Sequence, residues 1–68
     1  MKDWKPLIGV PVTFERRDHL GSREIRLTLL PDNSVYLDGD EELVFDQGRD
    51  PLKAAMDYLQ EKGYKKRA

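Results

Sequence analysis

The chain has 68 residues, of which 38% are hydrophobic and 37% are charged, and its formal net charge is -1. This length allows one domain with a single layer of core and excludes two lobes around a deep cleft. Because the chain has no cysteine, it cannot be a disulfide scaffold or a zinc ribbon, and it has no thiol nucleophile. Its one histidine, His19, excludes a His-rich metal site. No apolar run approaches the roughly 20 residues of a membrane span. Asp3 and Pro6 interrupt the region where a secretion signal would lie, so we expect a cytoplasmic protein that does not bind membranes.

Residues 1–9 are predicted to form an N-terminal arm, because a proline and a glycine interrupt any regular pattern there. Apolar residues then alternate with other residues, which predicts a half-buried strand. The side chains expected to face the core are Val10, Val12 and Phe14. Because Pro11 lacks a backbone N–H, we expect this strand at a sheet edge with Pro11 facing solvent.

Three further strands are predicted between residues 23 and 45, separated by turn residues. The first carries an alternating apolar face made by Ile25, Leu27 and Leu29. Residues 30–34 predict a turn in which Asn33 adopts the left-handed conformation, and residues 35–37 form the next strand. The Asp-Gly pair at residues 38–39 predicts a tight hairpin turn before the last strand, residues 43–45.

The helix is predicted from its caps and from one apolar stripe. Asp50 is a suitable N-cap, and a proline follows it at the first helical position. The stripe consists of Leu52, Ala55, Met56 and Leu59. Gly63 predicts a Schellman stop in which Tyr64 contacts Leu59.

Four strands followed by one helix predict a small α+β domain. Short connections make consecutive strands antiparallel neighbours, and the helix is available to cover their apolar face. We therefore predict a four-stranded antiparallel meander sheet (ββββα) covered on one face by a single C-terminal helix. Residues 10–64 form this domain, and residues 65–68 form a basic tail.

The charge of the chain is unevenly distributed, because residues 37–52 contain six acids and a single base. An acidic rim beside apolar residues attracts a basic partner and sets its docking register, and carboxylates can also replace phosphates in a nucleic-acid-binding groove. The alternative is that hairpin tips are simply polar. The candidate partner-binding carboxylates are Asp38, Asp40, Glu41, Glu42 and Asp46.

The same segment does not predict a metal site. Its acids alternate as at the start of a calcium loop, but Leu43 stands where that loop needs glycine and Arg49 where it needs glutamate. His19 next to Asp18 is better explained as a turn residue than as a general base, since a one-layer domain offers little depth for catalysis. We expect no metal, no cofactor and no enzymatic activity.

Four arginines flank the first predicted turn: Arg16, Arg17, Arg23 and Arg26. Pairing of the two strands would bring them to one end of the sheet, where arginine side chains suit phosphate. Acidic residues are interleaved with them, so we favour cross-strand pairing of opposite charges over a nucleic-acid-binding surface.

Aromatic and aliphatic residues outside the predicted core indicate a second candidate surface. Tyr36, Val44 and Leu30 would share the outer sheet face, and this apolar patch favours a homodimer or a partner protein there. Trp4 in the arm is either a binding anchor or a lid over the small core.

These observations favour a non-enzymatic protein-interaction module, an inhibitor, adaptor or small subunit that binds a protein with a basic surface. Its size and charge are those of the inhibitors that phages and mobile elements direct at host machinery. The alternative function is nucleic-acid binding through the four arginines.

Overall fold

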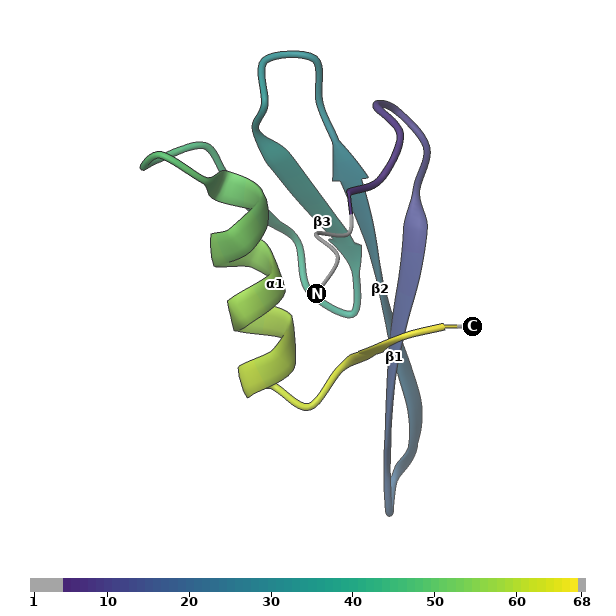
Figure 1. The fold of residues 1–68 in the computed structure, drawn as a ribbon. Coiled ribbons are helices and arrows are strands. Elements are labelled where there is room, and N and C mark those ends of the chain that lie inside the picture. The colour runs from purple at the N-terminus through teal and green to yellow at the C-terminus, as the bar shows by residue number, and fades with distance from the viewer. Residues whose placement is uncertain (1–4, 68) are drawn as a thin grey trace.

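The computed structural model describes residues 5–67 and shows one antiparallel sheet with a single helix against one of its faces (Figure 1). The predicted α+β meander with one helix is therefore confirmed. The strand order in the sheet is β4-β3-β2-β1-β5. The elements are β1 (Val12–Asp18), β2 (Gly21–Leu29), β3 (Val35–Gly39), β4 (Leu43–Phe45), α1 (Pro51–Glu61) and β5 (Lys65–Lys66). No helix within residues 5–67 is both long enough and apolar enough to cross a bilayer.

The residues after the helix belong to the sheet, where we expected a basic tail. Lys65–Lys66 pairs antiparallel with β1 as β5, and the backbone N–H of Arg67 donates to the Thr13 carbonyl at 2.9 Å. β1 is consequently flanked on both sides at this point, which corrects the expectation of an edge strand. Pro11 is exposed and precedes the strand. The turn at the end of α1 causes the difference, because it directs the chain back to β1.

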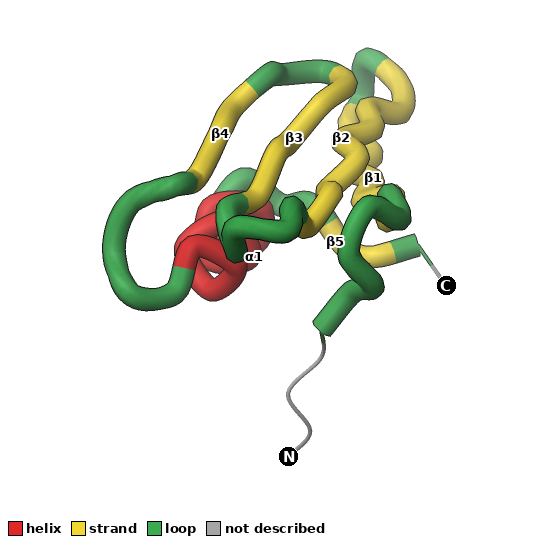
Figure 2. Tube along the Cα trace, turned by 90° about the horizontal axis from the view of Figure 1, so that it is seen from above, coloured by secondary structure: helices red, strands yellow, loops and turns green. Residues whose placement is uncertain are grey.

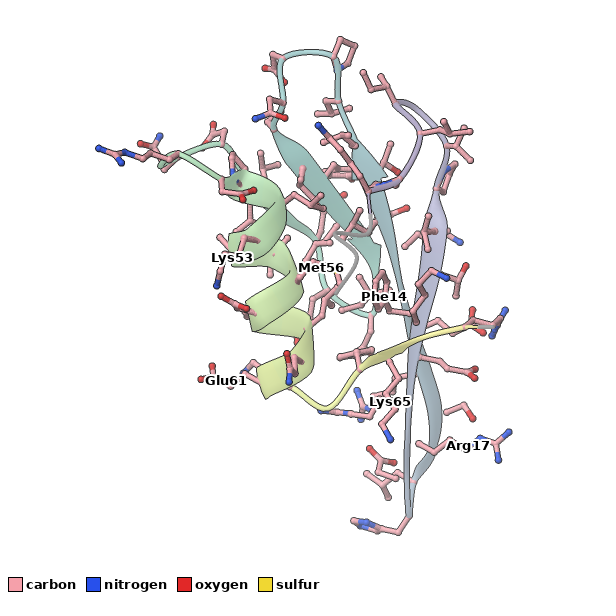
Figure 3. The ribbon with its side chains drawn as sticks, in the orientation of Figure 1. Phe14, Arg17, Lys53, Met56, Glu61 and Lys65 are labelled. Atoms are coloured by element: carbon pink, nitrogen blue, oxygen red, sulfur yellow. The ribbon has the colours of Figure 1, made fainter. Side chains whose placement is uncertain are left out.

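The core lies between the sheet and α1 and is made mainly by the inner face of β2 and β3. Ile25 and Leu27 are fully buried, and they pack with Leu59 of the helix. Figure 3 shows Phe14 of β1 and Met56 of α1 on the inner side of the sheet and helix. The predicted stripe of α1 is thus the side that packs, although Leu52 and Met56 are only half-buried. Val10, expected to face the core, is 48% exposed because it precedes β1.

The helix and the N-terminal arm contact different strands of the sheet. α1 packs mainly against β3 and β4, and Figure 2 shows it below these two strands. Beside β2, Ile8 forms a parallel bridge with Leu29, and the Gly9 N–H donates to the Leu29 carbonyl at 2.8 Å. Pro6 of the arm is buried. Trp4, a candidate lid or binding anchor, lies outside the described residues.

One turn of the sheet forms as predicted, and one does not. Asn33 has a φ of 74°, as predicted for the turn between β2 and β3. The Asp-Gly pair does not form the predicted tight turn, because Gly39 remains in β3 opposite Ile25. Gly39 has a φ of 140°, and a Cβ there would lie 2.5 Å from the Glu24 carbonyl oxygen. The connection between β3 and β4 is therefore the segment 40–42.

Both predicted ends of the helix are confirmed. The Asp50 carboxylate accepts from the Lys53 N–H at 3.1 Å. At the other end, the Tyr64 N–H donates to the Leu59 carbonyl at 2.9 Å and the Gly63 N–H to the Gln60 carbonyl at 3.0 Å. These two bonds are the Schellman pattern.

Leu59→Ala tests the core. Because Leu59 is 1% exposed, its truncation leaves a cavity and should lower the free energy of unfolding by about 2–5 kcal/mol. Leu20→Ala is the matched control, since Leu20 is 74% exposed and the same change should cost at most about 0.5 kcal/mol. Chemical denaturation measures both, and equal losses would show that Leu59 is not in the core.

Gly39→Ala tests the close approach of β3 to β2. Contact with the Glu24 carbonyl and the positive φ should together destabilise the fold by about 1–3 kcal/mol. Gly48→Ala has a positive φ but no atom within 4 Å of the added Cβ, so it should lose only the backbone contribution of about 1 kcal/mol. Thermal unfolding separates the two variants, and a smaller loss at Gly39 would contradict the steric argument.

Candidate interaction surface

Three consecutive carboxylates between β3 and β4 accept hydrogen bonds from the three tyrosines of the chain. We call this set the tyrosine–carboxylate cluster. Its pairs are Tyr64 with Asp40 (3.0 Å), Tyr58 with Glu41, and Tyr36 with Glu42 (2.5 Å). Each tyrosine hydroxyl donates, and each carboxylate oxygen accepts. The candidate binding residues Asp40, Glu41 and Glu42 therefore also have a structural role within the domain.

The cluster joins parts of the fold that are distant in sequence. Tyr36 belongs to β3, Tyr58 to α1, and Tyr64 to the connection between α1 and β5. The Tyr58 ring also packs against Phe45 of β4, with ring centroids 5.8 Å apart. One short connection thus contacts the sheet, the helix and the segment that leads to β5.

The hydrogen bonds shift the titration of all three tyrosines. For Tyr36 and Tyr58, the bonded carboxylate is the main cause of a pKa raised above the ordinary value. For Tyr64, burial raises the pKa most, and the hydrogen bond to Asp40 adds to it. The common reason is that loss of the phenolic proton breaks a hydrogen bond and creates a second negative charge beside a carboxylate.

The four arginines do not form one surface, because the strand alternation divides them between two faces. Arg16 and Arg23 lie opposite each other on the helix side, together with Phe14 and Ile25. Arg17 and Arg26 therefore lie on the outer face. The expectation of a single arginine cluster is corrected by this register.

Three of these arginines are engaged by contacts within the domain. Arg26 pairs with Asp38 at 2.8 Å, and Arg23 pairs with Asp40 at 3.1 Å. Arg16 donates to the Lys62 carbonyl at 2.9 Å and lies over the Tyr64 ring, 5.2 Å from its centroid. Arg16 consequently holds the end of the helix against β1. These contacts explain why an arginine stands at position 16, without a need for an anion from outside the domain.

Like charges face each other across β1 and β2, where we expected opposite charges. Glu15 is opposite Glu24, and Arg16 is opposite Arg23. Such pairs are destabilising unless a third charge intervenes. Arg67 supplies it for the two glutamates, 3.1 Å from Glu15 and in contact with Glu24.

Asp18 has the equivalent role on the helix side. Its carboxylate lies 3.7 Å from Arg16 and 3.6 Å from Arg23. The interleaved acids are thus used for pairing, as expected, although not with the residues directly opposite them.

A hollow of about 440 Å³ lies between β1 and the segment that connects α1 to β5. It is lined by Glu15, Arg16, Arg17, Gly63 and Lys65. The Arg16 Nε is buried without a hydrogen-bond partner in the described part of the chain. The terminal nitrogens of Arg16 are engaged, so Arg17 and Lys65 are the cations that this hollow offers to solvent.

Of the three apolar residues predicted for the outer face, only Val44 is in the exposed class. Val44 is 56% exposed, but its cross-strand neighbour Tyr36 is half-buried, and so is Leu30. Asp46 follows β4 and is exposed, and its carboxylate accepts from the adjacent Gln47 amide at 3.3 Å. Of the candidate partner-binding residues that the structure describes, Val44, Asp46, Glu42 and Asp40 are exposed, whereas Tyr36, Asp38 and Glu41 are half-buried.

His19 is exposed in the turn between β1 and β2. Within residues 5–67, no group of three or more His, Cys, Asp or Glu side chains is placed to hold a metal ion. No protein-family model, curated protein or solved structure matches the chain.

The tyrosine–carboxylate cluster predicts a loss of stability at high pH. The pKa of each tyrosine is raised on folding, so its contribution is complete below the unfolded value of about 10 and is lost as the pH rises through the folded value. Tyrosinate absorbance during an alkaline titration measures this directly. Native tyrosines should titrate above those of the chain in denaturant, and Tyr36→Phe should remove one of the shifted groups. Equal titration of native and denatured chain would contradict the cluster.

Proposed function

We propose that the chain is a non-enzymatic protein-interaction module, an inhibitor, adaptor or small subunit, which binds a partner protein with a basic surface. The binding surface in this proposal is the β4 end of the sheet, with Val44 at its centre and acidic side chains around it. The exposure of Val44 between two carboxylates that form no ion pair with another described residue is the observation that supports it best.

The charge of this surface follows from which carboxylates have cationic partners. Asp38 and Asp40 are paired with arginines. Glu41, Glu42 and Asp46 have no ion pair with another described residue, and a tyrosine hydroxyl does not neutralise a carboxylate. The end of the sheet near β4 thus carries an uncompensated negative charge. Such a field accelerates encounter with a basic partner and orients it.

A protein partner is favoured over nucleic acid by the way the arginines are used. Binding of phosphate would compete with the ion pairs of Arg23 and Arg26 and with the contact of Arg16 at the helix end. Arg17 is then the one arginine of the first hairpin left for phosphate, and a single arginine gives a small footprint. The resemblance in size and charge to phage-type inhibitors is compatible with the proposal and does not select the partner.

Affinity capture with charge variants tests the proposal. The chain is used as bait in a lysate of the cells that naturally contain it, alongside Asp46→Lys and Val44→Asp. Each variant should weaken capture of a specific protein at least about tenfold, or about 1.4 kcal/mol. Glu61→Lys is the matched control, because it makes the same charge change as Asp46→Lys at an exposed position of α1. Capture that survives both surface variants, or that is lost equally in the control, would contradict the proposal.

A binding titration with nucleic acid tests the alternative. Filter binding of single-stranded and double-stranded DNA and RNA at low salt should show no retention by the chain. Retention that falls steeply with added salt and is lost in Arg17→Glu would instead support the nucleic-acid hypothesis.

A further inference from the structure

The two edges of the sheet differ in how they end. β5 covers one edge beside β1, whereas β4 is the last strand at the other edge. Figure 2 shows β4 at the outside of the sheet, beyond β3. Within residues 5–67, β3 is the only strand with which β4 pairs. An edge of this kind exposes backbone groups that can form hydrogen bonds with another chain.

The hydrogen-bond pattern of the neighbouring strands identifies which backbone groups face outward. The Leu30 N–H donates to the Ser34 carbonyl at 2.9 Å, so the antiparallel alternation makes Thr28 and Tyr36 the next bonded pair of β2 and β3. The Asp40 N–H, which donates to the Glu24 carbonyl at 2.9 Å, has the same phase. Tyr36 therefore directs its backbone groups to β2.

The next strand follows from this alternation. Val35 and Leu37 direct their backbone groups to β4, where they meet Phe45 and Leu43. Val44, opposite Tyr36, consequently directs its N–H and carbonyl away from β3 toward the open edge. Its side chain stands on the outer sheet face, so backbone and side chain are both accessible at this residue.

Acidic residues flank this position on both sides. Glu42 and Asp46 are two residues before and after Val44, and alternation places all three on the outer face. The hydrogen bond from Tyr36 to Glu42 agrees with that placement, since Tyr36 and Val44 are cross-strand neighbours. The edge thus presents an acidic, apolar, acidic pattern along one face.

This pattern distinguishes between possible occupants of the edge. A second copy pairing antiparallel about Val44 would set Glu42 of each chain against Asp46 of the other, which is destabilising. An extended segment with basic residues at the same spacing would face two carboxylates and one valine side chain. The acids that protect the edge from self-association therefore favour a basic strand.

We propose that the open edge of β4 binds an extended segment of the partner protein as an added strand, with the pattern basic, any residue, apolar, any residue, basic. This inference rests on the proposed function and specifies its binding mode. The backbone groups of Val44 supply main-chain hydrogen bonds, while Glu42 and Asp46 select the lysine or arginine side chains.

The experiment uses the full chain and a blocked peptide, Lys-Thr-Val-Thr-Lys, with NMR detection of amide hydrogen exchange. At millimolar peptide, the Val44 amide should become protected at least about fivefold, whereas the Leu43 and Phe45 amides are already protected by β3. The control peptide Glu-Thr-Val-Thr-Glu should give no protection. A peptide with N-methylated valine, which removes one strand donor, should bind more weakly than the parent.

Val44→Pro provides the test from the side of the protein. Proline removes an N–H that β3 does not use, so the variant should keep its unfolding midpoint and lose peptide binding. If this variant is unfolded, the N-methylated peptide decides the question, because it leaves the chain unchanged. Equal binding of the N-methylated and parent peptides would overturn strand addition.

The remaining outcomes separate this inference from the proposed function. Absence of Val44 protection with the basic peptide overturns strand addition. It leaves the proposed function standing if capture still depends on Val44 and Asp46. Protection that increases with protein concentration without peptide would assign the edge to a second copy and also overturn the inference. If capture depends on neither Val44 nor Asp46, the proposed function itself is contradicted.

Discussion

The connection between β3 and β4 is the constraint on which the rest of the structure depends. Tyr36, Tyr58 and Tyr64 donate to three successive carboxylates in it, from the sheet, the helix and the segment after the helix. β4 has only three residues and, in the part of the chain that the structure describes, one neighbouring strand, so its own ladder gives it little stability. The tyrosine–carboxylate cluster holds this edge in place and couples it to the core.

The ion pairs within the domain determine which charged side chains remain for binding a partner. Arg23 and Arg26 pair with carboxylates at the end of β3, and Arg67 balances the two glutamates of β1 and β2. The near-neutral total of the chain therefore does not describe its surface. Among residues 5–67, three carboxylates that form no ion pair, Glu41, Glu42 and Asp46, lie just before and after β4, near the exposed Val44. That coincidence of charge, an apolar side chain and an open edge is the basis of the proposed binding mode.

Sequence patterns predicted those features that depend on neighbours in the chain. The alternation of Ile25 and Leu27, the cap at Asp50 and the stop at Gly63 each arise from chemistry within a few residues. The tight turn at Gly39 was predicted wrongly, because contact with β2 keeps that glycine in the strand.

The candidate site was harder to predict from the sequence, because it is formed by residues that are far apart in the chain. Tyr58 and Glu41 are 17 residues apart, and Tyr64 and Asp40 are 24 apart. Lys65 and Lys66 carry no strand pattern, and they form β5 only because the helix stop returns them to β1. An acidic segment identifies a surface, whereas the partners of each acid require the register of the whole sheet.

Native-state hydrogen exchange of the Asp40 amide tests most directly whether this connection is coupled to the core. The Asp40 N–H bonds to the Glu24 carbonyl, so it reports the opening of the connection itself. If the tyrosine–carboxylate cluster couples the segment to sheet and helix, Asp40 should open with the same free energy as the core amides of Leu27 and Leu59. Exchange of Asp40 through a local opening of much lower free energy, while those two amides remain protected, would contradict the account.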